Sequence, residues 1–236
     1  MTNTLIVLTG TRTWTLKDGS AHPTGFWVEE FAAPHRIFTE AGHRITIATP
    51  GGVAPVGDEL SLAPAMNGGD EAVVAELRAY LEESQEALAA AVPLSSIDPA
   101  DYDVVFIPGG HGPMEDLATD PDIARILEAT LDDPSKVVAS LCHGPASFVT
   151  ATRDGKWLFD GRTLTAFLDE EETQAGFAAK APWLLERRLR QQGATFQAAP
   201  AWQSHVVVDG NLVTGQNPQS SAAAARAVLD LVSASR

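Results

Sequence analysis

Four short apolar runs constrain most strongly what this chain can fold into. They span residues 5–8, 45–48, 104–107 and 137–141. Each run is apolar on both faces, a pattern typical of strands buried inside a parallel sheet. Longer stretches with apolar residues at helical spacing separate the runs, which predicts helices that cross from strand to strand. The sequence therefore predicts an α/β fold of the flavodoxin-like type, with a doubly wound, mostly parallel sheet between two layers of helices.

The intervening and C-terminal segments predict the remaining elements. Helices are expected at residues 33–41, 71–91, 123–131, 182–192 and 220–233. Pro34 would lie in the first turn of the first helix, and Ser220 would cap the last one. A hairpin with a tight Asp-Gly turn is expected at residues 206–213. No repeat or linker divides the sequence, so a single domain of residues 1–236 is expected.

Charge and cysteine content exclude several classes of protein. With 31 acidic and 16 basic residues, the formal net charge is −15. Such a surface repels phosphate backbones and anionic lipid, so neither a nucleic acid nor a membrane is expected as a partner. One cysteine cannot form a disulfide within the chain and is typical of a reducing compartment. No stretch resembles a signal peptide or a membrane span, and a cytoplasmic protein is expected.

The strongest local signal lies at the end of the fourth run, where residues 137–141 lead directly into Cys142-His143-Gly144-Pro145. This order predicts a strand–turn–helix elbow that lifts one side chain above the carboxyl edge of the sheet. Cys142 would be a nucleophile there, with its pKa lowered by the N-terminus of the following helix. His143 would act as a general base or stabilise the thiolate. The alternative is a small buried thiol beside an exposed or capping histidine.

A glycine-rich turn, Pro108-Gly109-Gly110-His111-Gly112, closes the third run. Free backbone N–H groups of Gly109 and Gly110, next to His111, predict an oxyanion hole and a substrate-binding loop. The Gly-x-Gly-x-x-Gly spacing of a dinucleotide-binding loop is absent. The alternative interpretation is an ordinary tight turn.

Two acidic segments are further candidates. Glu29 and Glu30 follow the apolar and aromatic residues 26–28, and a glutamate buried there would have a raised pKa and hold a proton near the thiol. The run of acids at residues 169–172 would supply a carboxylate that orients His143. From the residues alone, acids of this kind more often lie in solvent at the start of a helix.

No metal site and no cofactor are expected. Histidines at positions 22, 35, 43, 111, 143 and 205 lack the close spacing of metal ligands. With one cysteine, a thiolate-rich zinc site is impossible.

Together these segments resemble a known superfamily. The elbow at residues 140–145 and the loop at residues 107–112 resemble the ThiJ/PfpI superfamily, which has the class I glutamine amidotransferase-like fold. Residues 24–34 and 209–218 resemble its heat-shock chaperone and glyoxalase III branch. The similarity extends over nearly the whole chain, with the segments in the same order.

The resemblance implies a role for each candidate. Cys142 matches the family nucleophile and His143 its neighbouring base. Glu172 matches the triad acid of the branch, and Glu171 takes that place if the register slips by one. Glu30 matches the glutamate that contacts the nucleophilic sulfur. The Gly110 N–H matches an oxyanion donor, with that of His143 as a second donor. The metal-binding trio of some larger members has no match here.

The activity implied is a glyoxalase III, which converts methylglyoxal and water to lactate without glutathione or another cofactor. A proton would move between the two carbons through His143 or, alternatively, Glu30. Other hypotheses stay open: a cysteine amidase, peptidase or deglycase, a stress-responsive holdase, and a redox sensor whose thiol oxidises readily. Because members of the superfamily are commonly dimers, the resemblance also implies a homodimer.

Overall fold

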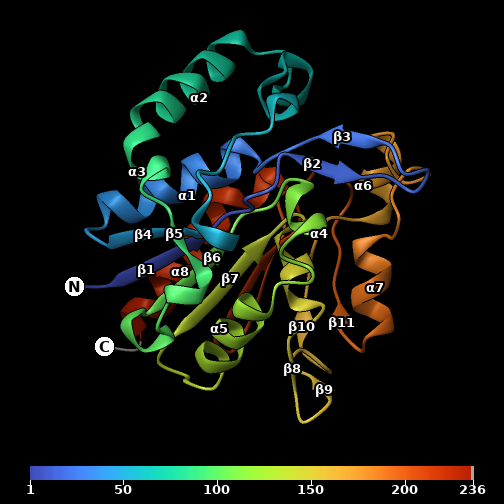
Figure 1. Cartoon of the computed structure of the whole chain (residues 1–236). Coiled ribbons are helices and arrows are strands. Elements are labelled where there is room, and N and C mark those ends of the chain that lie inside the picture. The colour runs from blue at the N-terminus through green and yellow to red at the C-terminus, as the bar shows by residue number, and fades with distance from the viewer. Residues whose placement is uncertain (235–236) are drawn as a thin grey trace.

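The structure is a computed structural model that describes residues 1–234, and its centre is a seven-stranded sheet (Figure 1). The strands lie in the order β12-β13-β7-β6-β1-β4-β5. Their bounds are β1 Asn3–Val7, β4 Arg44–Thr49, β5 Val92–Pro93, β6 Val104–Ile107, β7 Val137–Leu141, β12 Val206–Asp209 and β13 Leu212–Gly215. Neighbouring strands are parallel, except that β12 pairs antiparallel with β13. The predicted doubly wound, mostly parallel sheet is therefore confirmed.

Helices cover both faces of this sheet (Figure 1). Their bounds are α1 Val28–Glu40, α2 Glu71–Glu83, α3 Gln85–Ala89, α4 Gly112–Glu115, α5 Pro121–Leu131, α6 Asp169–Gln174, α7 Leu185–Gln191 and α8 Ser221–Ala234. Helices α1 and α8 pack against each other and α8 contacts β7 and β13, whereas α5 packs against β6 and β7 from the other side. None of the helices within residues 1–234 combines the length and the apolar composition needed to cross a membrane.

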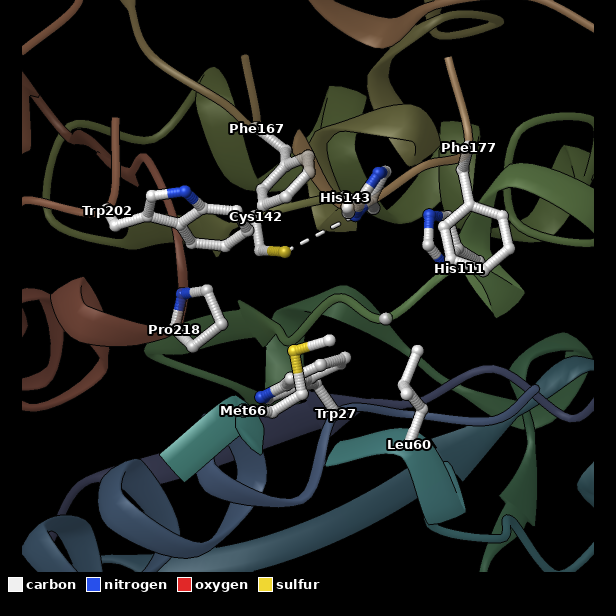
Figure 2. Close-up of a pocket in the computed structure, with 12 residues that line it drawn as sticks. Trp27, Leu60, Met66, His111, Cys142, His143, Phe167, Phe177, Trp202 and Pro218 are labelled. Atoms are coloured by element: carbon white, nitrogen blue, oxygen red, sulfur yellow. Dashed lines mark hydrogen bonds between the residues drawn. The ribbon is translucent and has the colours of Figure 1, made fainter. Parts of the chain in front are cut away.

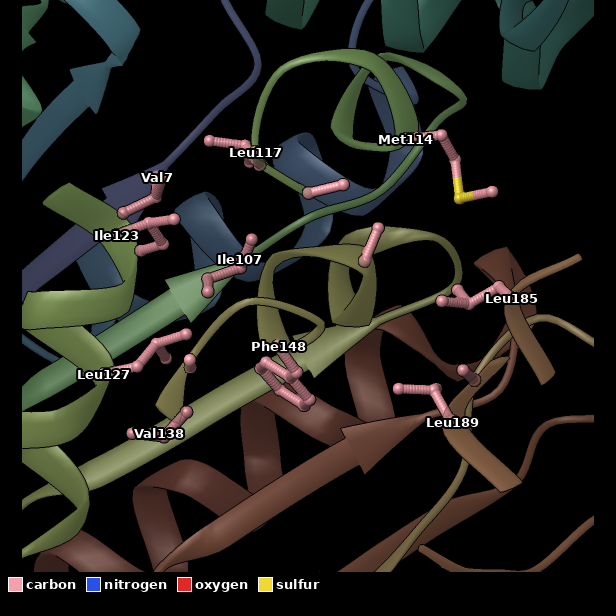
Figure 3. Packing of buried hydrophobic residues seen from close by; sticks show 14 of the residues in the cluster. Val7, Ile107, Met114, Leu117, Ile123, Leu127, Val138, Phe148, Leu185 and Leu189 are labelled. Carbon is pink, nitrogen blue, oxygen red and sulfur yellow. The ribbon is translucent and has the colours of Figure 1, made fainter. Parts of the chain in front are cut away.

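Alternation of side chains along the strands produces two apolar cores. Leu5 and Val7 of β1 belong to the cluster on the α5 side, and Ile6 belongs to the cluster on the α1 and α8 side. Figure 3 shows the first cluster, in which Ile123 and Leu127 of α5 lie over the sheet. Since both faces are buried, the strands are apolar at successive positions, which is the reason that the sequence shows continuous apolar runs.

Small sheets and short 3-10 turns complete the chain. The two-stranded sheets are β2 Thr13–Thr15 with β3 Ala21–Pro23, β8 Thr152–Arg153 with β9 Lys156–Trp157, and β10 Thr163–Leu164 with β11 Thr195–Phe196. The 3-10 turns are η1 Pro50–Gly52, η2 Glu59–Leu62, η3 Pro64–Asn67, η4 Leu94–Ser96, η5 Pro99–Asp101, η6 Gly144–Phe148 and η7 Pro218–Ser220.

Two predicted helices differ from the structure. Helix α1 begins at Val28 instead of residue 33, so Pro34 lies inside the helix and not in its first turn. Val28 and Phe31 are fully buried there, and their packing outweighs the cost of a proline that donates no hydrogen bond. The single helix predicted at residues 71–91 is two helices, because the chain bends at Ser84, which has ψ near 0°.

The C-terminal elements occur where they were predicted, with small shifts. Helix α7 begins three residues later than predicted, at Leu185. The hairpin forms, but its two turn residues are Gly210 and Asn211, since Asp209 still pairs with Leu212. The closing helix follows η7, where the hydroxyl of Ser220 accepts a hydrogen bond from the His205 amide and donates one to Asn217.

Candidate active site

Cys142 stands where β7 ends, at the carboxyl edge of the sheet. Its backbone has φ 57°, in the left-handed region that a non-glycine residue rarely adopts. The Cys142 N–H donates to the Gly215 carbonyl at 2.9 Å, and its carbonyl accepts from the Phe167 N–H at 2.9 Å. These contacts hold a strained elbow in place, as predicted. The helix that follows the elbow is the five-residue 3-10 turn η6.

A chain of side-chain contacts runs from the thiol to a buried acid (Figure 2). The Cys142 Sγ lies 3.3 Å from His143 Nδ1, and His143 Nε2 lies 2.6 Å from Glu172 Oε2. A carboxylate can only accept a hydrogen bond, so Glu172 favours the His143 tautomer with the proton on Nε2. This tautomer leaves Nδ1 free to accept the thiol proton. The sharp turn of the elbow therefore lets two adjacent residues face each other.

A second histidine binds the same acid. The Nε2 of His111 lies 2.9 Å from Glu172 Oε1, and the ring stacks on Trp14 with centroids 4.4 Å apart. Burial opposes the charged form of Glu172, but the charge of His143 and hydrogen bonds from both histidines outweigh burial and hold the pKa of Glu172 below its usual range. Burial also lowers the pKa of His111, which therefore donates as a neutral ring. Sequence reasoning placed His111 in the loop but missed this contact.

Glu171, the other candidate acid, faces away from His143. Its Oε1 accepts hydrogen bonds from Asn217 Nδ2 at 2.7 Å and from the Trp202 amide at 2.8 Å, and its Oε2 accepts from the Leu168 amide at 3.0 Å. The side chain is fully buried. Glu171 therefore ties helix α6 to the segments around residues 202 and 217, while Glu172 reaches the histidines.

Glu30 lies on the other side of the sulfur. Its Oε2 accepts from the Gly109 amide at 2.6 Å. Its Oε1 has no conventional hydrogen-bond partner among residues 1–234, and Glu30 interacts with the Cys142 thiol. Burial raises the pKa of Glu30 to about 8, so the carboxyl holds its proton at neutral pH. This agrees with the buried, protonated glutamate predicted from the sequence.

The thiol itself is buried, and burial together with the neighbouring Glu30 raises the pKa of Cys142. The sequence predicted a lowered pKa from a helix dipole, and that expectation is wrong because η6 is a single short turn and the thiol is buried. A hydrogen bond from the Gly110 amide acts in the opposite direction and favours the thiolate. Whether the thiol loses its proton therefore depends on the groups in direct contact with it, which are His143, Glu30 and the Gly110 amide.

The glycine loop approaches the elbow too closely for any side chain. A Cβ on Gly109 would lie 2.5 Å from His143 N, and one on Gly110 would lie 2.5 Å from the Gly25 carbonyl oxygen. Gly110 also has φ 91°, a conformation that favours glycine. The Gly109 amide is occupied by Glu30, so of the two predicted amide donors it is Gly110 that faces the sulfur.

Three side chains could serve as metal ligands. One donor atom each from His111, His143 and Glu172 lies within 4.8 Å of the others, a set of two histidines and one carboxylate. The histidine spacing in the sequence gave no sign of it, because the fold brings two separate loops and helix α6 together. In the structure these atoms are hydrogen-bonded through Glu172, so a metal ion would have to displace the proton that orients His143.

The sulfur lines a small cavity. Apolar side chains form its walls: Trp27, Leu60, Met66, Phe167, Ala175, Phe177, Trp202 and Pro218. Figure 2 shows Trp202 and Phe167 on one side of the thiol, with Trp27 and Met66 across the gap. Sequence reasoning did not identify these walls, because they come from loops whose places are set by the completed fold.

A flavodoxin-like sheet with a cysteine at such an elbow is the arrangement of the DJ-1/ThiJ/PfpI fold. The chain belongs to the DJ-1/PfpI family, which its residues 23–231 match. It is 30% identical to Glyoxalase 3 of Candida albicans over 97% of this chain and 98% of that protein. It is also 30% identical to the glutathione-independent glyoxalase HSP31 of Saccharomyces cerevisiae, over 92% of each chain.

Comparison with solved structures agrees with this family assignment. The crystal structure of glyoxalase III from Candida albicans matches with a TM-score of 0.79 and 30% sequence identity, covering 98% of this chain and 97% of that one. The similarity therefore extends over the whole fold, and these relatives place the chain among enzymes.

Proposed function

We propose that the protein is a glutathione-independent glyoxalase, which converts methylglyoxal and related 2-oxoaldehydes to 2-hydroxy acids through Cys142. The observation that carries the proposal is the continuous contact from Cys142 Sγ through His143 to Glu172, with Glu30 on the opposite side of the sulfur. A nucleophile between two proton carriers suits a reaction that adds a thiol and then moves a proton between carbons. The names of the relatives support the same activity.

In the first step, the Cys142 sulfur bonds to the aldehyde carbon. The thiol proton passes to His143 Nδ1, 3.3 Å away, and then to the aldehyde oxygen, giving a neutral hemithioacetal. Glu172 stabilises the imidazolium while it holds the proton. The Gly110 amide donates to the oxygen as negative charge develops there. This step explains why a raised thiol pKa is tolerated: the proton leaves only as the carbon–sulfur bond forms.

In the second step, a base removes the hydrogen of the former aldehyde carbon, giving an enediol, and returns a proton to the neighbouring carbon. We assign this transfer to Glu30, because its Oε1 has no other partner and its pKa of about 8 lies close to working pH. His143 is the alternative carrier. The product is a thioester with an adjacent hydroxyl group. One carbon is oxidised and its neighbour is reduced, so no redox cofactor takes part.

In the third step, water attacks the thioester carbon, the carbon–sulfur bond breaks, and the thiol regains its proton. The net reaction adds one water to methylglyoxal and gives lactate. Because the Nε2 atoms of His111 and His143 are both hydrogen-bonded to Glu172, we expect activity to survive treatment with a chelator such as EDTA.

The test is lactate formation from methylglyoxal without glutathione or added metal, with the Cys142→Ala variant as control. Lactate from the native protein alone supports the proposal, and equal activity in the variant contradicts it. The Glu30→Gln variant separates the two carriers. If Glu30 moves the proton, this variant accumulates the covalent adduct, seen by mass spectrometry, and makes no lactate; unchanged turnover assigns the transfer to His143. If no lactate forms at all, hydrolysis of amide and glycated substrates is measured next.

A further inference from the structure

The proposed reaction gives no task to His111, although this histidine is bonded to the same acid as His143. The carboxylate of Glu172 has one oxygen on each ring: Oε2 lies 2.6 Å from His143 Nε2, and Oε1 lies 2.9 Å from His111 Nε2. Among residues 1–234 the structure shows no third hydrogen-bond partner for this carboxylate. One buried acid therefore bridges two imidazoles, and only one of them, His143, contacts the thiol.

The hydrogen bond to Glu172 also decides where the proton of His111 lies. A carboxylate can only accept, so Nε2 of His111 carries the proton and Nδ1 is the bare nitrogen of a neutral ring. Nδ1 is buried and has no hydrogen-bond partner among residues 1–234. A proton on it would create a buried, unpaired N–H group, which is unfavourable, and burial lowers the pKa of His111 accordingly. His111 is therefore a constant donor, whereas Nδ1 of His143 faces the thiol.

Packing holds the His111 ring in one place. The ring stacks on Trp14, with centroids 4.4 Å apart and planes that differ by 8°, and Phe177 lies against it at 4.9 Å (Figure 2). The next residue in the loop is also fixed, because a Cβ on Gly112 would meet the side chain of Thr9. The donor on Nε2 is therefore presented to the acid from a fixed direction.

Loss of this donor would reach the thiol through Glu172 and then His143. Oε1 of Glu172 would become a buried acceptor without a partner, which is unfavourable. Because the terminal torsion of a glutamate is soft, the carboxylate would be free to turn toward other donors. His143 would then lose the fixed acceptor that keeps its proton on Nε2. With the proton on Nδ1 instead, the ring would direct an N–H at the sulfur and could not accept the thiol proton.

We propose that His111 is a positioning residue of the reaction: by holding Oε1 of Glu172 it keeps Oε2 on His143, and so keeps Nδ1 of His143 free to take the thiol proton. The inference rests on the proposed glyoxalase function and adds His111 to the line of contacts that begins at Cys142. His111 acts through the acid and not on the aldehyde. A packing role for the same ring predicts different results, since His111 also stacks on Trp14.

Two substitutions separate the hydrogen bond from the packing. His111→Gln keeps an N–H donor and loses the ring, whereas His111→Phe keeps a ring for Trp14 and loses the donor. For lactate formation from methylglyoxal, kcat should fall about tenfold or more in His111→Phe, and His111→Gln should retain most of it. An unchanged kcat in His111→Phe overturns the proposal, and so does a loss in His111→Gln as large as that in His111→Phe.

The control is His22→Phe. His22 also lies against Phe177, with centroids 4.7 Å apart, but it is not bonded to Glu172. Its kcat should match that of the native protein, and a loss equal to that of His111→Phe would assign the effect to the aromatic packing and overturn the proposal. Urea unfolding of each variant shows that the proteins compared are folded.

A second readout needs no variant of His111. The place of the proton on His143 is read in the native protein by ¹⁵N NMR, in which protonated and bare ring nitrogens have well separated chemical shifts. The signals of His143 are those lost in His143→Gln. We expect a bare Nδ1 and a protonated Nε2 in the native protein and in His111→Gln, and a loss of this preference in His111→Phe. A native His143 with its proton on Nδ1 overturns the proposal.

Alkylation of Cys142 distinguishes failure of this proposal from failure of the glyoxalase function. Cys142 is the only cysteine, so its reaction with iodoacetamide is read directly from the mass of the protein. Because the thiolate is the reactive form and His143 takes the thiol proton, the rate should fall in His111→Phe and be kept in His111→Gln. If the native protein makes no lactate, the glyoxalase function fails while this order of rates still supports the positioning role. Equal rates in all three proteins overturn that role.

Discussion

Replacing Glu30 by glutamine should remove a loss of stability that the native protein suffers as pH rises. The carboxyl is fully buried, and its pKa is raised from 4.5 to about 8 by burial. In the unfolded chain the carboxyl ionises near its ordinary pKa, whereas in the folded chain it stays protonated. Folding therefore binds a proton between these values, and the free energy of unfolding falls as pH rises through this range.

The size of the effect follows from the pKa shift. At about 1.4 kcal/mol per pKa unit, the rise from 4.5 to about 8 is worth about 5 kcal/mol. About 4 kcal/mol of this is lost between about pH 5 and pH 9, because the shift is already partly expressed at the lower pH. Glutamine resembles the protonated acid and keeps an oxygen for the Gly109 amide. The Glu30→Gln variant should therefore gain stability relative to the native protein by about 4 kcal/mol over the same range.

Urea unfolding at about pH 5 and pH 9 measures the difference, since the contributions of groups that do not interact with Glu30 are shared by the two proteins. The control is Glu86→Gln, at an exposed glutamate, which should show no pH-dependent difference. Repeating the pair in a Cys142→Ala background removes the coupling to the thiol, and the same sign is expected there. A difference between native protein and Glu30→Gln that is constant within about 1 kcal/mol at both pH values would refute the reasoning.

Three further predictions concern the site and its backbone. Glu172→Gln should lower kcat by about 10²-fold or more with little change in KM. An amide that donates to His143 Nε2 favours the tautomer with the proton on Nδ1, which then cannot accept the thiol proton. A loss below about tenfold in steady-state assays would count against the triad. If Glu30 must ionise to act as base, kcat for methylglyoxal should rise about tenfold per pH unit up to about pH 8 and then level off, and a flat pH–rate profile would exclude that role. Gly110→Ala should cost about 2 kcal/mol or more, measured by urea unfolding, because its Cβ would meet the Gly25 carbonyl. Gly19→Ala, with a similar φ but open space around it, should cost only about 1 kcal/mol, and equal losses would show that the close contact is unimportant.

The sheet could be predicted from the sequence because its strands are buried on both faces. The runs at residues 104–107 and 137–141 match β6 and β7 residue for residue. A local pattern was sufficient in these cases, since a short continuous apolar run that ends at a turn is consistent with a buried strand. Helix α1 was harder to delimit, because Pro34 is locally unfavourable and only the packing of Phe31 against distant parts of the chain explains where the helix starts.

The candidate site was likewise predictable where its residues belong to a local motif, and not where they meet through the fold. Cys142 and His143 stand out because the elbow is a local feature, and Glu30 and Glu172 were chosen through a family resemblance. The second histidine on Glu172 could not be predicted, because the loop that carries His111 and the helix α6 that carries Glu172 meet only in the folded protein. The direction of the shift in the thiol pKa was also missed, since it depends on how deeply the folded protein buries the thiol and on the neighbouring Glu30.

The pocket takes its walls from positions as distant in the chain as Trp27 and Pro218. The elbow itself depends on β13, whose Gly215 carbonyl receives the Cys142 N–H. During synthesis on the ribosome the N-terminal part of a chain is made first, so the thiol is translated well before the strand and the indole that enclose it. Contacts this far apart in sequence form slowly. In the nascent chain Cys142 therefore lacks the cover that Gly215 and Trp202 give it in the folded protein, so a thiol-reactive reagent should reach it more readily before synthesis is complete than after.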